Sequence, residues 1–280
     1  MRNALNAIAD ELRRLKTAGV DTMPVTDEGL RRLRAAHERL QATAVAGTTA
    51  AAVATESALP APPTIELPAG DKSVRWAALR DIVLNDPVCR EHVRPGKKVV
   101  FGVGTLEADI MFVGEAPGAE EEVQGEPFVG PAGQLLTKMI AGMGLDRSKV
   151  YIGNIMNWRP EMPVNASGVQ FGNRPPSADE MKYCLPYLLR QIEIINPQVL
   201  VALGATAAQG LLGIGAFKAL GEVRGRWHEF AGKPLMITYH PSYILRNQSN
   251  RSKRLIWEDL LKVMERAGLA VSDKQRGYFL

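Results

Sequence analysis

Three polar segments of this sequence are candidates for a binding or catalytic site, because each lies in or directly after an apolar run that predicts a strand. Residues 114–118 read Gly-Glu-Ala-Pro-Gly after the run 109–113, Asn154 lies within 151–156, and residues 240–242 read His-Pro-Ser after 234–239. The carboxyl ends of strands in an open α/β sheet line a common crevice. A carboxylate, an amide and an imidazole can therefore converge there, where they could hydrogen-bond a ligand and stabilise charge.

The first segment continues into a long polar stretch with a single aromatic residue. Residues 120–122 are all Glu, and Phe128 stands in Pro-Phe-Val-Gly-Pro-Ala-Gly at 127–133. Glycine lets the backbone approach a ligand closely, and an aromatic ring can stack on a flat one. From residue types alone, a solvated Glu stripe and a core Phe remain alternatives for this stretch.

The run 114–133, together with His-Pro-Ser-Tyr-Ile-Leu-Arg at 240–246, resembles the uracil-DNA glycosylase superfamily, most closely its family 4 enzymes. The resemblance covers roughly residues 72–267. It implies a three-layer α/β/α fold with a central, mainly parallel sheet. It also implies a monofunctional enzyme of base excision repair that flips uracil out of single- or double-stranded DNA and hydrolyses its N-glycosidic bond, leaving an abasic site.

The resemblance gives four residues a role in holding uracil. Phe128 would stack on the base, and Asn154 would accept a hydrogen bond from N3–H and donate one to O4, a pattern that cytosine reverses. Glu121 would lie near C5 and exclude thymine. Ala116 would complete the pocket, at a position where the better-known motif Gly-Gln-Asp-Pro-Tyr has its water-activating Asp.

Two residues are implied for catalysis. Cleavage builds positive charge on the sugar and negative charge on uracil O2, so the site needs a donor near O2 and an anion or positioned water near the sugar. His240 matches the histidine that contacts O2. Glu115 matches the carboxylate of the motif and is assigned to the water or the cationic sugar.

The segment after His240 is implied to contact DNA. Leu245 or Ile244 would fill the gap left by the flipped base, while Ser242 and Arg246 would hold phosphates. Residues 218–254 support this interpretation, since they contain eight Lys or Arg and only two Glu. Such a stretch supplies affinity for the DNA backbone regardless of sequence.

A family cofactor is expected to be missing. Family 4 members carry a [4Fe-4S] cluster on four cysteines, but this chain has only Cys89 and Cys184, and Trp158 stands where a third would be. Asp86 and His92 have compatible spacing but are poorer ligands. The sequence therefore predicts no metal, no cofactor required for the chemistry, and Trp158 packed into the vacated volume.

The elements that must position these residues follow the alternation typical of an α/β domain. Strands are predicted at 98–101, 109–113, 151–156, 198–203 and 234–239, and helices at 131–143, 177–194, 206–212 and 251–267. Residues 1–41 predict a helical hairpin, 42–71 an Ala/Pro-rich linker, and 72–280 the catalytic domain. Residues 161–173 form an insertion relative to the family, either at the DNA-facing rim or as a plain surface loop.

Composition narrows the setting. The net charge is +4, but residues 72–280 hold 26 Lys and Arg against 21 Asp and Glu, so a polyanion should meet this part. Two cysteines exclude a disulfide framework, and the N-terminus lacks the apolar stretch of a signal peptide. A cytoplasmic monomer without a membrane contact is expected, with any protein partner of the N-terminal helices unknown.

Several alternatives remain open from the sequence. One is a catalytically impaired DNA-binding protein of the same fold, and another is a glycosylase for other deaminated bases such as hypoxanthine or xanthine. Gly102-Val103-Gly104 weakly suggests a nucleotide-binding enzyme, although Glu107 stands where a third glycine is expected. A relative that traps uracil covalently would need an Arg/His-rich loop, which residues 161–176 do not provide.

Overall fold

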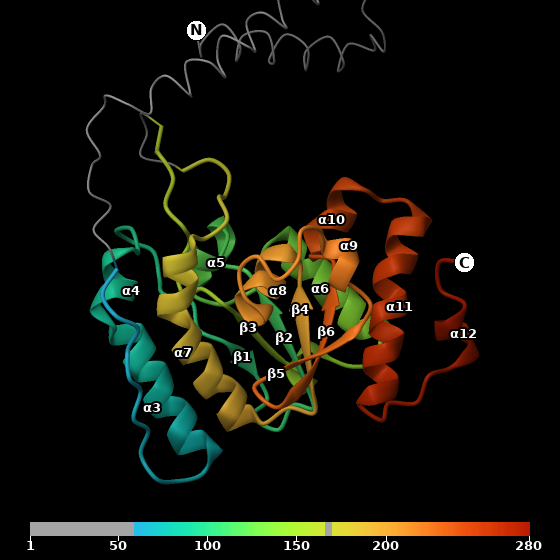
Figure 1. The fold of residues 1–280 in the computed structure, drawn as a ribbon, viewed down its shortest axis with the longest axis horizontal. Coiled ribbons are helices and arrows are strands. Elements are labelled where there is room, and N and C mark those ends of the chain that lie inside the picture. Colours follow the sequence, from blue (N-terminus) through green and yellow to red (C-terminus); the bar gives the residue numbers. More distant parts are fainter. Residues whose placement is uncertain (1–58, 166–169) are drawn as a thin grey trace, which may run out of the picture. The chain divides into compact units, whose positions relative to one another are not determined.

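The computed structural model describes residues 59–165 and 170–280, which contain one six-stranded sheet (Figure 1). Its strand order is β1-β3-β2-β4-β6-β5. The four inner strands are parallel, and both edge strands pair antiparallel. The strands are β1 (Val103–Gly104), β2 (Ile110–Gly114), β3 (Tyr151–Asn154), β4 (Val199–Leu203), β5 (Trp227–Phe230) and β6 (Lys233–Thr238).

Helices connect these strands. They are α3 (Lys72–Asn85), α4 (Pro87–Glu91), α5 (Ala119–Gln124), α6 (Pro131–Gly142), the 3₁₀ turn η1 (Arg147–Lys149), α7 (Ala178–Ile195), α8 (Ala205–Leu212), α9 (Leu220–Val223), α10 (Pro241–Arg246), α11 (Asn250–Arg266) and α12 (Asp273–Arg276). Helix α7 begins with a capping box, since the Ser177 hydroxyl accepts from Glu180 N and the Glu180 carboxylate accepts from Ser177 N.

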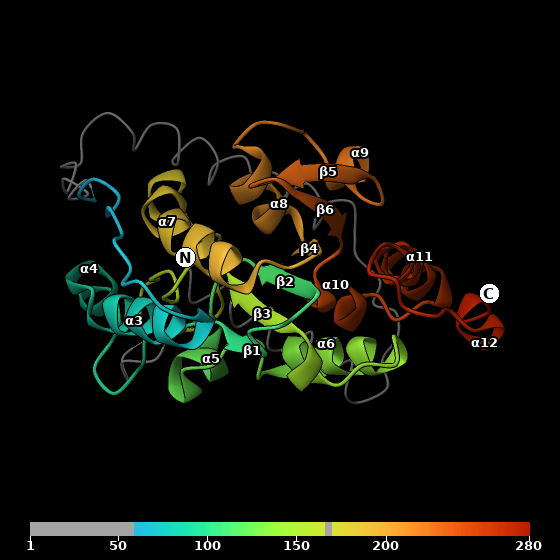
Figure 2. The same cartoon turned by 90° about the horizontal axis from the view of Figure 1, so that it is seen from below.

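The sheet has a helical layer on each face. Figure 2 shows α3, α7 and α8 on one side and α6, α10 and α11 on the other. Because side chains of a strand alternate between faces, neighbouring residues enter different cores. Met111 packs in the core under α7, whereas Ile110 and Phe112 pack in the core under α6 and α11. The predicted three-layer α/β/α fold is confirmed.

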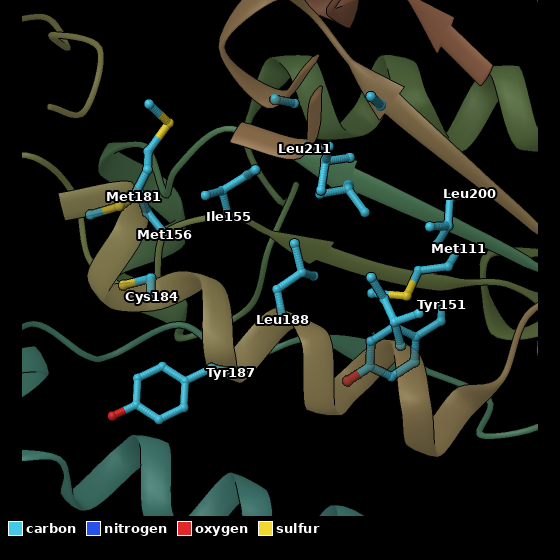
Figure 3. Packing of buried hydrophobic residues seen from close by; sticks show 14 of the residues in the cluster. Met111, Tyr151, Ile155, Met156, Met181, Cys184, Tyr187, Leu188, Leu200 and Leu211 are labelled. Atoms are coloured by element: carbon cyan, nitrogen blue, oxygen red, sulfur yellow. The ribbon is translucent and has the colours of Figure 1, made fainter. Parts of the chain in front are cut away.

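The core under α7 is built from long, flexible side chains as well as branched ones. Figure 3 shows Met156, Met181 and Cys184 close together at α7, with the Tyr187 ring extending from α7 away from the sheet, where its hydroxyl donates a hydrogen bond to Asp86. All four are buried. This packing lies next to Trp158, whose side chain is fully buried in the same core.

The structure corrects some predicted elements. Residues 98–101 form no strand, and the edge strand is the two-residue β1 instead. The Glu-rich stretch, expected as a loop, contains α5, and β5 and α10 had not been predicted. No helix follows Gly102-Val103-Gly104 before α5, so that segment lacks the strand-to-helix turn of a nucleotide site.

The predicted hairpin of residues 1–41 lies outside the described part of the chain. The described end of the predicted linker has no helix or strand before α3, but it is not free of the domain. Ile65 is buried in the core, and Leu59 and Leu67 pack against it. Across residues 59–165 and 170–280, no helix combines the length and the apolar character needed to span a membrane.

Candidate active site

A cleft of about 700 Å³ lies where the parallel strands end, and it gathers most of the predicted site residues. Gly114 ends β2, Asn154 ends β3 and His240 follows β6 by two residues. These strands are neighbours, with only β4 between β2 and β6. The predicted residues that line the cleft are Glu115, Ala116, Glu121, Phe128, Asn154, His240, Ser242, Leu245 and Arg246.

Asn154 and Phe128 form one wall of the cleft. Asn154 is buried, and its Oδ1 has no hydrogen-bond partner among the described residues. The Phe128 ring lies against Gly114, where a Cβ would stand 2.5 Å from the ring atoms. Phe128 itself has a φ of 56°, an uncommon left-handed conformation for a bulky residue. Asn154 therefore brings an unpaired acceptor to the same wall as the Phe128 ring.

Glu121 holds the backbone around Phe128. Its two carboxylate oxygens accept hydrogen bonds from the N–H groups of Gly118 at 3.1 Å, Val129 at 3.0 Å and Gly130 at 3.0 Å. Glu121 lines the cleft, but these three donors engage both of its oxygens. Glu121 therefore holds the loop of Phe128 through backbone hydrogen bonds. Its role in excluding thymine stays a prediction.

His240 presents a neutral imidazole to the cleft. Its Nδ1 is 3.2 Å from Ser242 N and 2.8 Å from Ser242 Oγ. A backbone N–H can only donate, so Nδ1 is the acceptor and the ring proton lies on Nε2. Burial, with a further contribution from the Arg246 charge, lowers the pKa of His240 to about 4. The ring centroid is 5.7 Å from that of Phe128.

Glu115 is one of three glutamates that line the cleft, with Glu120 and Glu121. Burial raises the pKa of its carboxyl above the usual value, while a hydrogen bond from Thr206 opposes this shift. The Glu115 carbonyl accepts from Met156 N at 3.0 Å, which extends the β2–β3 pairing beyond the strands. Thr206, which the sequence analysis did not identify, lies in the first turn of α8 after β4. Its position after β4, one of the four inner strands, could have identified it as a site residue.

Helix α10 separates the two proposed wedge residues. Leu245 is 41% exposed and lines the cleft, whereas Ile244 is 7% exposed and packs in the core under α6 and α11. Of the two, only Leu245 is exposed at the cleft. Arg246 donates to Ser242 Oγ at 3.2 Å, which links a cation to the residue that orients His240.

A buried ion pair supports the end of β6. Asp259 accepts from Thr238 Oγ1 at 2.6 Å and from Arg224 Nη1 at 2.7 Å, and the Arg224 guanidinium lies over the Tyr239 ring. Tyr239 directly precedes His240, Arg224 contacts Tyr239, and Asp259 contacts Thr238. No sequence motif marks Asp259, which lies in the amphipathic helix α11.

The residues at the expected cluster position do not fit a [4Fe-4S] group. Cys89 and Cys184 are both buried, and the hydrogen bond with Cys184, together with burial, raises the pKa of the Cys89 thiol. Trp158 is fully buried and stacks on His92 with centroids 5.0 Å apart. In the described part of the chain, no three His, Cys, Asp or Glu side chains are grouped to hold a metal.

Asp86 cannot easily replace a cysteine there, because its carboxylate is already engaged. It accepts from Tyr183 OH at 2.9 Å, from Tyr187 OH at 2.8 Å and from Cys89 N at 2.7 Å. Two cysteines and an engaged carboxylate are not the four thiolates that such a cluster needs. Trp158 and the tyrosines occupy this region instead.

Another hollow, of about 780 Å³, lies between α3, α4 and the segment before β1. Its lining includes Arg80, Arg90 and Lys98 but none of the predicted site residues. The chemistry-bearing side chains thus gather in the cleft at the strand ends.

The fold is that of an α/β enzyme in which polar and aromatic side chains line a cleft at the carboxyl ends of the parallel strands. Comparison with known proteins agrees: residues 101–261 match the family model described as the uracil DNA glycosylase superfamily. The chain belongs to this superfamily.

Several relatives are named as type-4 uracil-DNA glycosylases. The Thermotoga maritima protein is 45% identical over 165 residues, covering 59% of this chain and 80% of the relative. The Pyrobaculum aerophilum protein is 38% identical over 181 residues, covering 62% and 87%. The Archaeoglobus fulgidus protein is 40% identical over 176 residues, covering 60% and 83%.

Proposed function

We propose that this chain is a uracil-DNA glycosylase that hydrolyses the bond between uracil and deoxyribose and leaves an abasic site. The observation that carries the proposal is the buried, unpaired Oδ1 of Asn154 beside the Phe128 ring. Leaving a buried acceptor unpaired costs roughly 1–3 kcal/mol, so its partner is expected to come with the ligand. Uracil supplies one, its N3–H.

Recognition follows from the fixed wall of the cleft. Asn154 accepts from N3–H through Oδ1 and offers its Nδ2 to O4, while Phe128 stacks on the base. Cytosine has an acceptor at N3 and a donor at position 4, so both contacts would become repulsive. Glu121 contributes by fixing Val129 and Gly130, which keeps the Phe128 backbone in its strained conformation.

Catalysis uses two groups: one stabilises the negative charge that develops on the base, and the other stabilises the positive charge that develops on the sugar. The Nε2–H of neutral His240 donates to O2 as electrons of the C1'–N1 bond move onto the base. The Glu115 carboxylate stabilises the cationic sugar and orients the water that adds to C1'. The water loses a proton, uracil leaves and is protonated, and the sugar retains the new hydroxyl.

Substrate delivery uses α10 and the basic stretch. Leu245 fills the place of the flipped base, and Ser242 and Arg246 hold flanking phosphates. The proposal comprises a monomer acting on single- or double-stranded DNA without an iron–sulfur cluster. We also propose a cytoplasmic setting. Both cysteines are free thiols, and a reducing compartment keeps thiols in this form.

Oligonucleotides with one uracil, single- and double-stranded, test the proposal after alkaline cleavage of abasic sites. We expect scission by the wild type and a loss of roughly 10²–10³-fold in the single-turnover rate for His240→Ala, the effect of removing one donor to a developing anion. Asn154→Ala should also lose most of its activity. No scission by the wild type, or full activity in both variants, would contradict the mechanism. Parallel substrates with hypoxanthine or xanthine test the other deaminated bases.

A further inference from the structure

Phe171 is the most exposed aromatic residue of the described chain, and it stands beside the mouth of the cleft. It is 70% exposed, and the next three residues, Gly172, Asn173 and Arg174, line the cleft. Two other exposed rings, Trp227 and Phe279, lie under the cations of Arg266 and Lys253. In the described residues, Phe171 has no stacked ring and no cation over its face.

The backbone on both sides of Phe171 is fixed. Gln170 is buried, and its side chain donates to Pro160 O at 3.1 Å and accepts from Met162 N at 3.1 Å. Gly172 has a φ of +77°, and its carbonyl accepts from Arg159 Nη2 at 2.8 Å. Hydrogen bonds to Gln170 and Gly172 therefore hold the turn that exposes the Phe171 ring.

Arg159 ties this turn to the cleft. It is 7% exposed, donates through Nε to Asn173 Oδ1 at 2.8 Å and pairs through Nη1 with Glu122 Oε1 at 2.9 Å. Glu122 belongs to α5, which directly follows the segment with Glu115. In Figure 1 the segment after β3 rises beyond α5, from the edge of the sheet that also carries α10. The position of Phe171 is thus set relative to the cleft.

The proposed function identifies the occupant of this surface as the DNA strand that carries the uridine. Arg246 lines the cleft and can meet a backbone phosphate, whereas Arg174, which also lines it, is paired with Glu180. Exposed Leu245 also lines the cleft and can fill a duplex gap. In a duplex, the bases beside the gap stay stacked in the helix and offer no free face. In a single strand, each neighbouring base offers one, and aromatic side chains bind such faces regardless of sequence.

We propose that Phe171 is a stacking platform for the unpaired base next to the uridine, and that it favours single-stranded over double-stranded substrate. The inference rests on the proposed function, since it takes from it the uridine in the cleft. It gives Phe171 a DNA-binding role.

Binding is measured by fluorescence anisotropy with oligonucleotides that contain non-cleavable 2'-fluoro-deoxyuridine. We expect Phe171→Ala to bind the single strand about tenfold more weakly, in the range for loss of one stacked base, and the duplex within about twofold of wild type. Phe171→Tyr keeps a ring and should bind like wild type. Val164→Ala is the matched control, because Val164 is 49% exposed on the same segment.

Equal affinity of Phe171→Ala and wild type for the single strand would overturn the inference. So would an equal loss on single strand and duplex, or a similar loss in Val164→Ala. Circular dichroism confirms that each variant is folded. Uracil release by the wild type is scored separately: a protein that shows the Phe171 effect in binding but releases no base contradicts the proposed function, not the platform.

Discussion

His240 and Glu115 reach their protonation states by different routes. Burial and Arg246 keep the pKa of His240 near 4, so the imidazole is neutral through the physiological range. Burial raises the pKa of Glu115 above its usual value, and Thr206 works against that shift. In the proposed mechanism Glu115 must be ionised. The rate should therefore fall with decreasing pH as Glu115 becomes protonated, at a pH above the ordinary glutamate value of 4.5.

Thr206→Ala should move this acidic limb to higher pH. The hydroxyl stabilises the charged carboxylate, so its removal raises the pKa of Glu115 further and a larger fraction is protonated at any given pH. Single-turnover rates from pH 4.5 to 8 measure the limb. Thr206→Ser keeps the hydroxyl and should retain the wild-type profile. An unmoved limb in Thr206→Ala would assign it to another group.

The Trp158 region leads to a prediction about iron. With two thiols and an engaged Asp86, the chain should be purified without stoichiometric iron and without the visible absorption of a cluster. Reconstitution with iron and sulfide under anaerobic conditions should add neither. Metal analysis and absorption spectra check this. About four iron atoms per chain would show that the donor set is completed in another way.

Arg159 connects two elements on either side of the cleft, α5 and the turn of Phe171. The side chain of Arg159 is 6% exposed, and the side chain of its partner Glu122 is 9% exposed. Removing one member of a buried ion pair leaves the other charge uncompensated. Lys97, 3.8 Å from Glu122, offers only partial compensation.

Arg159→Met should lower the free energy of unfolding by about 3 kcal/mol, as for other broken buried pairs. Denaturant titration measures the change. The double variant Arg159→Met with Glu122→Gln should recover part of the loss, because no buried charge remains. Arg190→Met is the matched control: its pair with Glu193 is exposed, so a change under about 1 kcal/mol is expected. Equal effects at both sites would contradict the burial argument.

At the scale of elements, strong hydrophobic patterns were sufficient for prediction and weak ones were not. β2 and β4 are continuous apolar runs and β6 contains one at 235–237, which is typical of buried parallel strands. The two-residue β1 has no pattern to detect, and β5 alternates at an edge. Helix α5 is short and acidic, and its Gly118 cap relies on the side chain of Glu121.

At the scale of the whole molecule, convergence of the site was predictable because inner parallel strands end at one edge. The contacts that hold it were not. Thr206, Arg159 and Asp259 act through tertiary hydrogen bonds between segments whose distance along the chain carries no spacing signal. Glu121 was identified as a site residue, but its bonds to three backbone groups became visible only in three dimensions.

The cleft lining begins at Glu115 and ends at Arg246, within the compact unit Ala58–Leu280. A chain that begins at Ala58 should therefore release uracil from short oligonucleotides with a kcat/KM within about threefold of the full chain, as expected of a domain with its own core. The full-length protein is the control in the same assay. A loss above tenfold would show that residues 1–57 contribute to catalysis or folding.

The unpaired Oδ1 of Asn154 also bears on turnover. Its hydrogen bond is made by the base and not by the sugar, so free uracil satisfies it as well as uridine does. Once the glycosidic bond is broken, the excised base still stacks on Phe128 and still occupies the acceptor. We expect free uracil to inhibit competitively, and its departure to limit multiple turnovers more than the chemical step does.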